Sequence, residues 1–219
     1  MSVSQGVYAI YDRTTLADDA LDRVDAVLAH GARWLQYRDK RPQAPDKALV
    51  AALASRTRAH GARLIINDDW RLAAACGADG VHLGQSDGSI AAARAGLGPD
   101  AIIGVSCSGE LERARRGVAE GASYVSFGRF FASRTKPDAP PADPAVLGAA
   151  RALGVPVVAI GGIDAHNAPR LIAAGADLVA VAGALFAAAD SAAATRELAA
   201  AVAAARRSSD IHLLQESRS

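Results

Sequence analysis

Short apolar runs alternate with longer alanine-rich segments along almost the whole chain. The short runs are rich in β-branched and aromatic residues, a composition that is typical of strands. We predict eight strands, at residues 7–12, 34–38, 63–67, 80–84, 102–106, 124–128, 156–160 and 178–182. Between them, apolar residues recur at helical spacing, which predicts helices that include 16–30, 44–60, 110–120, 143–153 and 165–174. The last of these carries Asn167-Ala168-Pro169, a pattern typical of a helix N-terminus.

Strands and helices alternate without interruption, which predicts parallel strands joined by right-handed crossovers. Eight such units fit a closed (β/α)8 TIM barrel of the α/β class, formed by a single domain over residues 1–207. A doubly wound open sheet is the alternative. A recurring Gly-Ala pair before a strand favours the barrel, because glycine can end the preceding helix. These glycines are Gly31, Gly61, Gly77, Gly121 and Gly175. Residues 208–219 have no helical spacing, and we expect a flexible C-terminal tail there.

Composition and charge narrow the classes of function. Hydrophobic residues make up 51% of the chain, charged residues 21%, and the formal net charge is +1, so no nucleic-acid partner is expected. No apolar stretch reaches the roughly 20 residues that span a membrane, and the N-terminus does not resemble a signal peptide, so we expect a cytoplasmic protein without a membrane partner. Two cysteines are too few for a disulfide framework. The sequence does not fix the oligomeric state, and a homodimer is left open.

Cationic side chains follow the second predicted strand. Gln36, Arg38 and Lys40 alternate, so at a strand end they project to one side, toward the barrel axis. Polar side chains on an inward face require a ligand or water, and Arg together with Lys favours an anion such as phosphate. The alternative is a solvated strand end with one salt bridge to Asp39.

Carboxylates follow the next two strands. Asp68 ends the third strand and Asp87 lies just past the fourth, and neighbouring strands are about 4.8 Å apart. Two carboxylates that close repel each other unless a cation or a shared proton lies between them. Magnesium suits such a pair, because it takes one or two carboxylates together with phosphate oxygens and water. Alternatively, Asp69 or Asp87 caps the helix that follows.

The ends of later strands offer smaller polar groups. Ser106 ends the fifth strand, where it can donate to a polar heterocycle or cap the next helix. Gly161-Gly162 and Ala182-Gly183 end the last two strands and predict a cradle of backbone amides for a phosphate, although a Gly-Gly pair alone is only a tight turn. The connection over residues 129–141 is unusually long, which predicts a functional loop at the C-terminal face of the barrel or else a variable surface excursion.

Together these motifs resemble the thiamine phosphate synthase family. The likeness covers about Val7 to Phe186 and rests on Gln36-Tyr37-Arg38-Asp39-Lys40, Ile66-Asn67-Asp68, residues 80–87, Gly104-Val105-Ser106, Ser133-Arg134-Thr135-Lys136 and Ala159-Ile160-Gly161-Gly162-Ile163. The resemblance implies a (β/α)8 transferase that couples 4-amino-2-methyl-5-hydroxymethylpyrimidine diphosphate to thiazole phosphate, or its carboxy form, with Mg²⁺ as cofactor. Its products are thiamine phosphate and pyrophosphate.

The resemblance also assigns roles to residues. It implies that Asp68 and Asp87 bind magnesium. The catalytic residues that it implies are Arg38, Lys40, Lys136 and Ser106. The substrate-binding residues that it implies are Gln36, Tyr37, Arg38, Asp39, Lys40, Asn67, Ser106, Ser133, Arg134, Thr135, Lys136, Gly162, Ala182 and Gly183. Ser106 is expected at the pyrimidine, and the residues from Gly162 onward, with the loop hydroxyls, at the thiazole phosphate.

Four residues depart from the family pattern. Gly183 stands where a serine is common, Ala132-Ser133 where Pro-Thr is common, and Ser108 where a larger ring-bearing residue is common. The side-chain donors to the thiazole phosphate are therefore expected to differ from those of the family. The wall of the pyrimidine pocket is expected to differ as well.

The implied substrates favour a dissociative mechanism. An electron-rich aminopyrimidine stabilises the cation that forms when diphosphate leaves, and the thiazole nitrogen then captures it. The protein has to stabilise the departing negative charge, and no general base is needed. The alternatives are a thiazole tautomerase-like barrel, which relies on a histidine near position 108, and a non-catalytic phosphate-binding barrel. The complete diphosphate and magnesium set favours the synthase over both.

Overall fold

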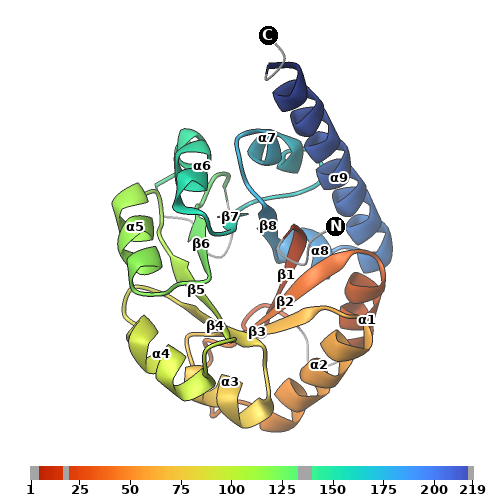
Figure 1. The fold of residues 1–219 in the computed structure, drawn as a ribbon. Coiled ribbons are helices and arrows are strands. Elements are labelled where there is room, and N and C mark those ends of the chain that lie inside the picture. The colour runs from red at the N-terminus through yellow and green to blue at the C-terminus, as the bar shows by residue number, and fades with distance from the viewer. Residues whose placement is uncertain (1–4, 17–19, 133–139, 217–219) are drawn as a thin grey trace.

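The strands of this protein form one closed parallel barrel surrounded by helices (Figure 1). The computed structural model describes residues 5–16, 20–132 and 140–216. Each strand pairs with its neighbours in sequence, and the last pairs with the first. The strands are β1 Gly6–Asp12, β2 Ala32–Arg38, β3 Arg63–Asn67, β4 Gly80–Leu83, β5 Ile102–Ser106, β6 Tyr124–Phe127, β7 Val157–Ile160 and β8 Leu178–Val181. The predicted TIM barrel is confirmed, and the open sheet is excluded.

Helices follow the strands in alternation and form the outer layer (Figure 1). They are α1 Leu21–Ala29, α2 Lys47–Ala59, α3 Trp70–Cys76, α4 Ile90–Leu97, α5 Leu111–Ala119, α6 Ala145–Ala150 with a 3-10 turn over Arg151–Leu153, α7 Ala168–Ala173, α8 Gly183–Phe186 and α9 Ser191–Glu216. The five glycines expected to end helices all have positive φ, as that role requires. In the part of the chain that the structure describes, no helix is long and apolar enough to cross a membrane.

The last helix is longer than the sequence suggested. A tail without helical structure was expected from residue 208, and this is wrong, because α9 continues to Glu216. Helix α9 packs against α1 and α7, and its Leu198 and Val202 are buried. Once these first turns are anchored, each further residue adds a hydrogen bond at little cost, so the helix extends into a segment that has no apolar stripe.

Alternation along the strands separates two cores. Side chains that point outward pack against the helices and form the larger core. Inward-pointing side chains fill the lower part of the barrel with Tyr8, Ile10, Trp34, Ile65, Tyr124, Val158, Leu178 and Ala180. The rings of Tyr8, Trp34 and Tyr124 meet edge to face, with centroids between 5.0 and 6.1 Å apart. Above this aromatic layer, at the carboxyl ends of the strands, the barrel opens into a pocket.

Candidate active site

A cavity of about 910 Å³ occupies the mouth of the barrel. Every strand contributes at least one residue to its lining, from Asp12 on β1 to Val181 on β8. The carboxyl ends of barrel strands are where TIM-barrel enzymes build their active sites, because loops there can vary without disturbing the core. The cavity is also large enough for two small substrates.

The three alternating residues of β2 and its end all line this cavity, as predicted. They lie at different depths, because each second residue along a strand is about 6.6 Å further on. Gln36 is deepest, and only 4% of this residue is exposed. Arg38 lies higher and donates to the buried Asp12 at 2.6 Å. Lys40 is at the rim and forms an ion pair with Asp68. The alternative of a solvated strand end paired with Asp39 is therefore wrong.

The residues between these three point away from the cavity. The Tyr37 ring is buried in the outer core, and its hydroxyl donates to Asp39 at 3.1 Å. Arg41 donates to both oxygens of Asp39, at 2.9 and 2.7 Å, and lowers the pKa of that carboxyl to about 2. Strand alternation turns the Tyr37 and Asp39 side chains to the helix side, so their predicted role in substrate binding stays a prediction without support from their position.

Asp68 and Asp87 face each other at the ends of β3 and β4 and share a hydrogen bond. Burial and this bond raise the pKa of Asp68. Burial also acts to raise the pKa of Asp87, but hydrogen bonds from Asp68 and from the Gly84 amide at 2.8 Å, together with the Lys40 charge, lower it below its ordinary value. The expected close pair of carboxylates is present, and it lies beside a lysine.

The capping alternative holds for Asp69 but not for Asp87. Asp69 accepts from the Arg71 and Leu72 amides and caps α3, whereas Ser89 caps α4. Asp87 is therefore left for the cavity. The Asp68 backbone has φ 67, a left-handed conformation that is uncommon outside glycine and is concentrated at functional sites.

Magnesium fits the donor set at this position. The part of the chain that the structure describes has no group of three or more His, Cys, Asp or Glu side chains that could hold a metal by themselves. Mg²⁺ does not need such a group, since one or two carboxylates with phosphate oxygens and water complete its octahedron. Asp68 and Asp87 face each other where a cation could lie between them, and Asn67 lines the cavity beside them.

The opposite wall of the cavity is made of backbone. Gly161 and Gly162 follow β7 with φ 104 and 66, and a Cβ on Gly162 would overlap the carbonyl of Ala132. Asn167, expected to mark a helix start, does not cap α7 with its side chain. Its Nδ2 donates to the Gly162 carbonyl at 3.0 Å, and its Oδ1 accepts from the Asp164 amide at 3.0 Å. This side chain fixes the turn after β7, next to Ala182 and Gly183 at the end of β8.

The remaining predicted residues divide into two groups. Ser106 lines the cavity and does not cap α5, whose N-cap is Glu110, and Ser108 lies near it at the mouth with φ 53. Ser133, Arg134, Thr135 and Lys136 lie outside the described residues, so their predicted roles stay predictions.

Sequence reasoning missed several residues that the barrel brings into the cavity. Asp12 is the partner of Arg38, and its position just after the first apolar run was the available signal. Deeper in the barrel, Gln36 Nε2 donates to the Tyr8 hydroxyl at 2.8 Å. That hydroxyl lies 3.0 Å from the Tyr124 hydroxyl, which lies 2.8 Å from His82 Nδ1. No local pattern indicated this series of hydrogen bonds, because its four side chains come from four different strands.

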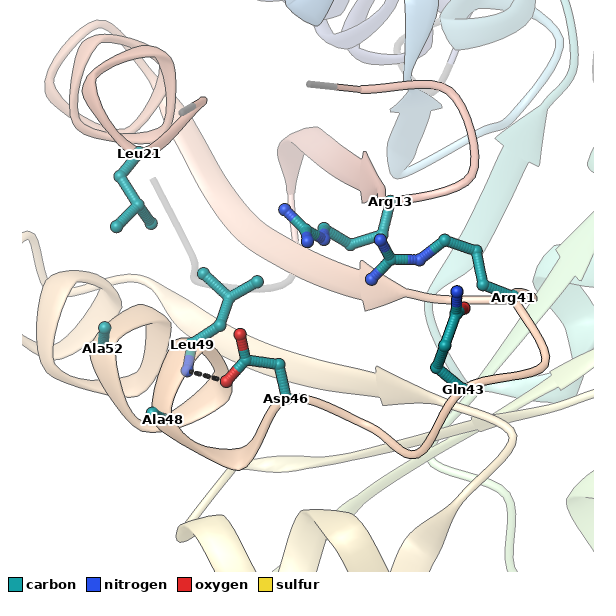
Figure 2. Close-up of a pocket in the computed structure, with 8 residues that line it drawn as sticks. All are labelled: Arg13, Leu21, Arg41, Gln43, Asp46, Ala48, Leu49 and Ala52. Carbon is teal, nitrogen blue, oxygen red and sulfur yellow. Dashed lines mark hydrogen bonds between the residues drawn. The ribbon is translucent and has the colours of Figure 1, made fainter. Parts of the chain in front are cut away.

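A second hollow, of about 600 Å³, lies outside the barrel beside α2 (Figure 2). Arg13, Arg41 and Gln43 line one side of it, and Leu21 and Leu49 line the other. Its described lining includes one carboxylate, that of Asp46, which caps α2 by accepting from the Leu49 amide at 2.9 Å. We therefore place the chemistry at the barrel mouth, where facing carboxylates and cations meet.

Comparison with known proteins gives one consistent family. The family model for thiamine monophosphate synthase matches residues 7–185. The thiamine-phosphate synthase of Methylobacillus flagellatus is 55% identical over 196 residues, which are 88% of this chain and 93% of the relative. That of Chromobacterium violaceum is 57% identical over 175 residues, 80% of this chain and 84% of the relative. The thiamine phosphate pyrophosphorylase of Pyrococcus furiosus has a similar structure, with a TM-score of 0.80 and 32% identity over 92% of this chain and 97% of that one.

Proposed function

The chain belongs to the thiamine monophosphate synthase family, and from that premise we propose that it couples an aminopyrimidine methyl diphosphate to a thiazole phosphate. The products are thiamine phosphate and pyrophosphate. One observation supports this proposal most strongly: Asp68, Asp87 and Lys40 meet at one point of the cavity rim, with Arg38 below them. That arrangement suits a diphosphate held by a hard cation and by charged side chains.

Asp68 and Asp87 are the residues that would hold Mg²⁺. Bound there, the ion supplies positive charge to the oxygens of the leaving diphosphate. Lys40 and Arg38 act on the same oxygens. Asp12 accepts from Arg38 Nη1 at 2.6 Å, so the guanidinium is oriented before substrate arrives and needs little rearrangement when negative charge grows.

The reacting carbon lies, in this proposal, between the diphosphate site and the polar floor of the cavity. The pyrimidine occupies the floor, where Ser106 and Gln36 offer hydrogen bonds. Cleavage of the carbon–oxygen bond leaves its electron pair on pyrophosphate and a cation on the pyrimidine methylene. The thiazole nitrogen then donates its lone pair to that carbon. Nothing in this sequence of bonds requires a proton to be removed.

We propose that the thiazole phosphate binds at the ends of β7 and β8. The turn that Asn167 fixes and the amide of Gly183 line that wall, and the loop hydroxyls of Ser133 and Thr135 are the further donors expected there. This gives the two phosphates opposite walls of one cavity, with the reacting atoms between them.

The direct test is to mix the purified protein with both substrates and Mg²⁺ and to measure thiamine phosphate and pyrophosphate together. Equal amounts of the two products are expected, with none when either substrate is omitted or when EDTA is added. Isomerisation of a thiazole carboxylate phosphate without coupling would instead support the tautomerase alternative. Binding of both ligands without turnover would support the non-catalytic barrel.

A further inference from the structure

The polar floor of the cavity is one connected hydrogen-bonded unit. Gln36, Tyr8 and His82 line the cavity, whereas Tyr124 lies beneath them and is fully buried. The Tyr124 hydroxyl is within hydrogen-bonding distance of both Tyr8, at 3.0 Å, and His82 Nδ1, at 2.8 Å. The His82 and Tyr124 rings are also stacked, with centroids 5.5 Å apart and an angle of 22° between their planes. Tyr124 thus connects Tyr8 on one side of the floor to His82 on the other, and does not itself line the cavity.

The backbone of β5 makes room for this tyrosine. A Cβ on Gly104 would overlap the Tyr124 ring at Cζ and Cε1, so the ring fits only over a glycine. Trp34 packs edge to face against the same ring, with centroids 5.0 Å apart. The position of the Tyr124 hydroxyl is therefore set by packing on two sides and by hydrogen bonds on the other two.

The hydrogen bonds between Gln36 and His82 are linked through the single proton of the Tyr124 hydroxyl. Gln36 Nε2 donates to the Tyr8 oxygen, and Tyr124 donates either to Tyr8 or to His82 Nδ1, but not to both. If Tyr124 donates to His82, the histidine proton lies on Nε2, and if it donates to Tyr8, the histidine proton lies on Nδ1. Burial raises the pKa of both tyrosines, so both hydroxyls keep their protons at neutral pH. The Gln36 amide and the His82 ring cannot change orientation independently.

We propose that Tyr124 is a positioning residue for the pyrimidine end of the cavity: its hydroxyl couples the amide orientation of Gln36 to the tautomer of His82. This rests on the proposed function. An aminopyrimidine has ring nitrogens that accept and an amino group that donates, so its recognition requires a donor and an acceptor at fixed places. Without the Tyr124 hydroxyl, Gln36 and His82 each sample more than one orientation, and the floor no longer selects one ring pose.

The substitution Tyr124→Phe removes one oxygen and keeps the ring over Gly104. We expect it to raise KM for the pyrimidine diphosphate about tenfold, the upper end for one buried hydrogen bond, and to leave KM for the thiazole phosphate within about twofold. Tyr11→Phe is the matched control, because Tyr11 is fully buried on β1 and its hydroxyl has no partner among the described residues. That variant should leave both KM values unchanged.

A spectroscopic measurement on the ligand-free protein separates this proposal from a merely structural role. In ¹⁵N-labelled wild type at neutral pH, the ring nitrogens of His82 should show the shifts of one tautomer. Their assignment comes from the signals lost in His82→Gln. In Tyr124→Phe the two shifts should move toward averaged values, while Tyr11→Phe leaves them in place. Unchanged His82 shifts in Tyr124→Phe, or a parallel rise of both KM values, would overturn the proposal.

Two further outcomes are covered by the same set of proteins. If Tyr124→Phe does not fold, Tyr8→Phe breaks the same chain one link away and should raise the same single KM. If both variants fold, their effects on that KM should be less than additive, since either one disconnects Gln36 from His82. Full additivity would mean that the two hydroxyls act separately. Absence of thiamine phosphate synthesis in the wild type would defeat the proposed function, whereas the His82 shifts would still test the coupling.

Discussion

The two walls of the cavity present opposite kinds of chemistry. At the ends of β2, β3 and β4 the lining consists of charged side chains, with Arg38, Lys40, Asp68 and Asp87 within reach of one another. At the ends of β7 and β8 it consists of backbone, where Gly162 and Gly183 bring the main chain to the cavity. The first wall acts through full charges, which suits a group that gains negative charge during a reaction. The second acts through amides, which suits a phosphate that stays unchanged.

The walls should therefore fail in opposite ways. Removing atoms damages the charged wall, because a lost carboxylate or ammonium group takes its charge with it. Adding a Cβ damages the backbone wall where the main chain is tightly packed, as at Gly162, but not where the surrounding space is open, as at Gly183. The four substitutions below test this contrast, in order of decreasing effect.

Asp87→Ala should have the largest effect. It removes one of the two carboxylates proposed for Mg²⁺, and we expect turnover to fall by roughly 10²–10⁴, the loss of several kcal/mol of transition-state stabilisation. The measurement is kcat at saturating substrates over a range of Mg²⁺ concentrations, and half-saturation should move to higher Mg²⁺. Asp22→Asn, on the exposed side of α1, is the control. Wild-type activity in Asp87→Ala would remove this residue from the metal site.

Lys136→Ala should have the next largest effect, if this residue holds the diphosphate as the family resemblance implies. A lysine that contacts the departing diphosphate stabilises the transition state more than the ground state, so kcat should fall roughly 10- to 100-fold with a smaller change in KM. Steady-state kinetics with each substrate varied in turn gives both parameters. Lys47→Ala, at the start of α2, controls for loss of a surface charge. A rise in KM alone would limit Lys136 to ground-state binding.

Gly162→Ala tests the backbone wall by addition. Gly162 has φ 66, and its new Cβ would overlap the Ala132 carbonyl, so the turn has to shift. We expect KM for the thiazole phosphate to rise about tenfold while KM for the pyrimidine diphosphate stays unchanged, since strain of this kind costs about 1–3 kcal/mol. Gly154→Ala is matched for backbone, with φ 72 and open space around its Cβ. Equal changes in the two proteins would mean that the effect is not local to the cavity.

Gly183→Ser should have the smallest effect, and in the favourable direction. A Cβ at Gly183 meets nothing within 4 Å, so a hydroxyl can be added there without strain. A new donor to the thiazole phosphate is worth about 0.5–1.5 kcal/mol, which should lower its KM several-fold. Gly183→Ala adds the Cβ without the hydroxyl and should change little. If the pyrimidine KM moves as well, Gly183 does not belong to the second phosphate wall.

The sequence by itself determined the architecture and the charged wall. Strand and helix periods are local properties, so all eight strands lie where the apolar runs predicted them, and the period of two placed Gln36, Arg38 and Lys40 on the inner face. The same period turns the side chains of Tyr37 and Asp39 to the helix side, and only the family resemblance had assigned these two residues to the substrate. Charged residues at strand ends are visible in a sequence because they interrupt apolar runs.

Only the tertiary structure decided which side chains meet across the barrel. Strand register places Arg38 beside Asp12, and the closed sheet brings Tyr8 and Tyr124 together from opposite halves of the chain. It also decided that Asn167 holds the turn after β7 with its side chain and that α9 extends to Glu216. These outcomes depend on contacts between residues far apart in sequence, and spacing along the chain carries no information about them, since the energy of each contact arises only when the barrel closes.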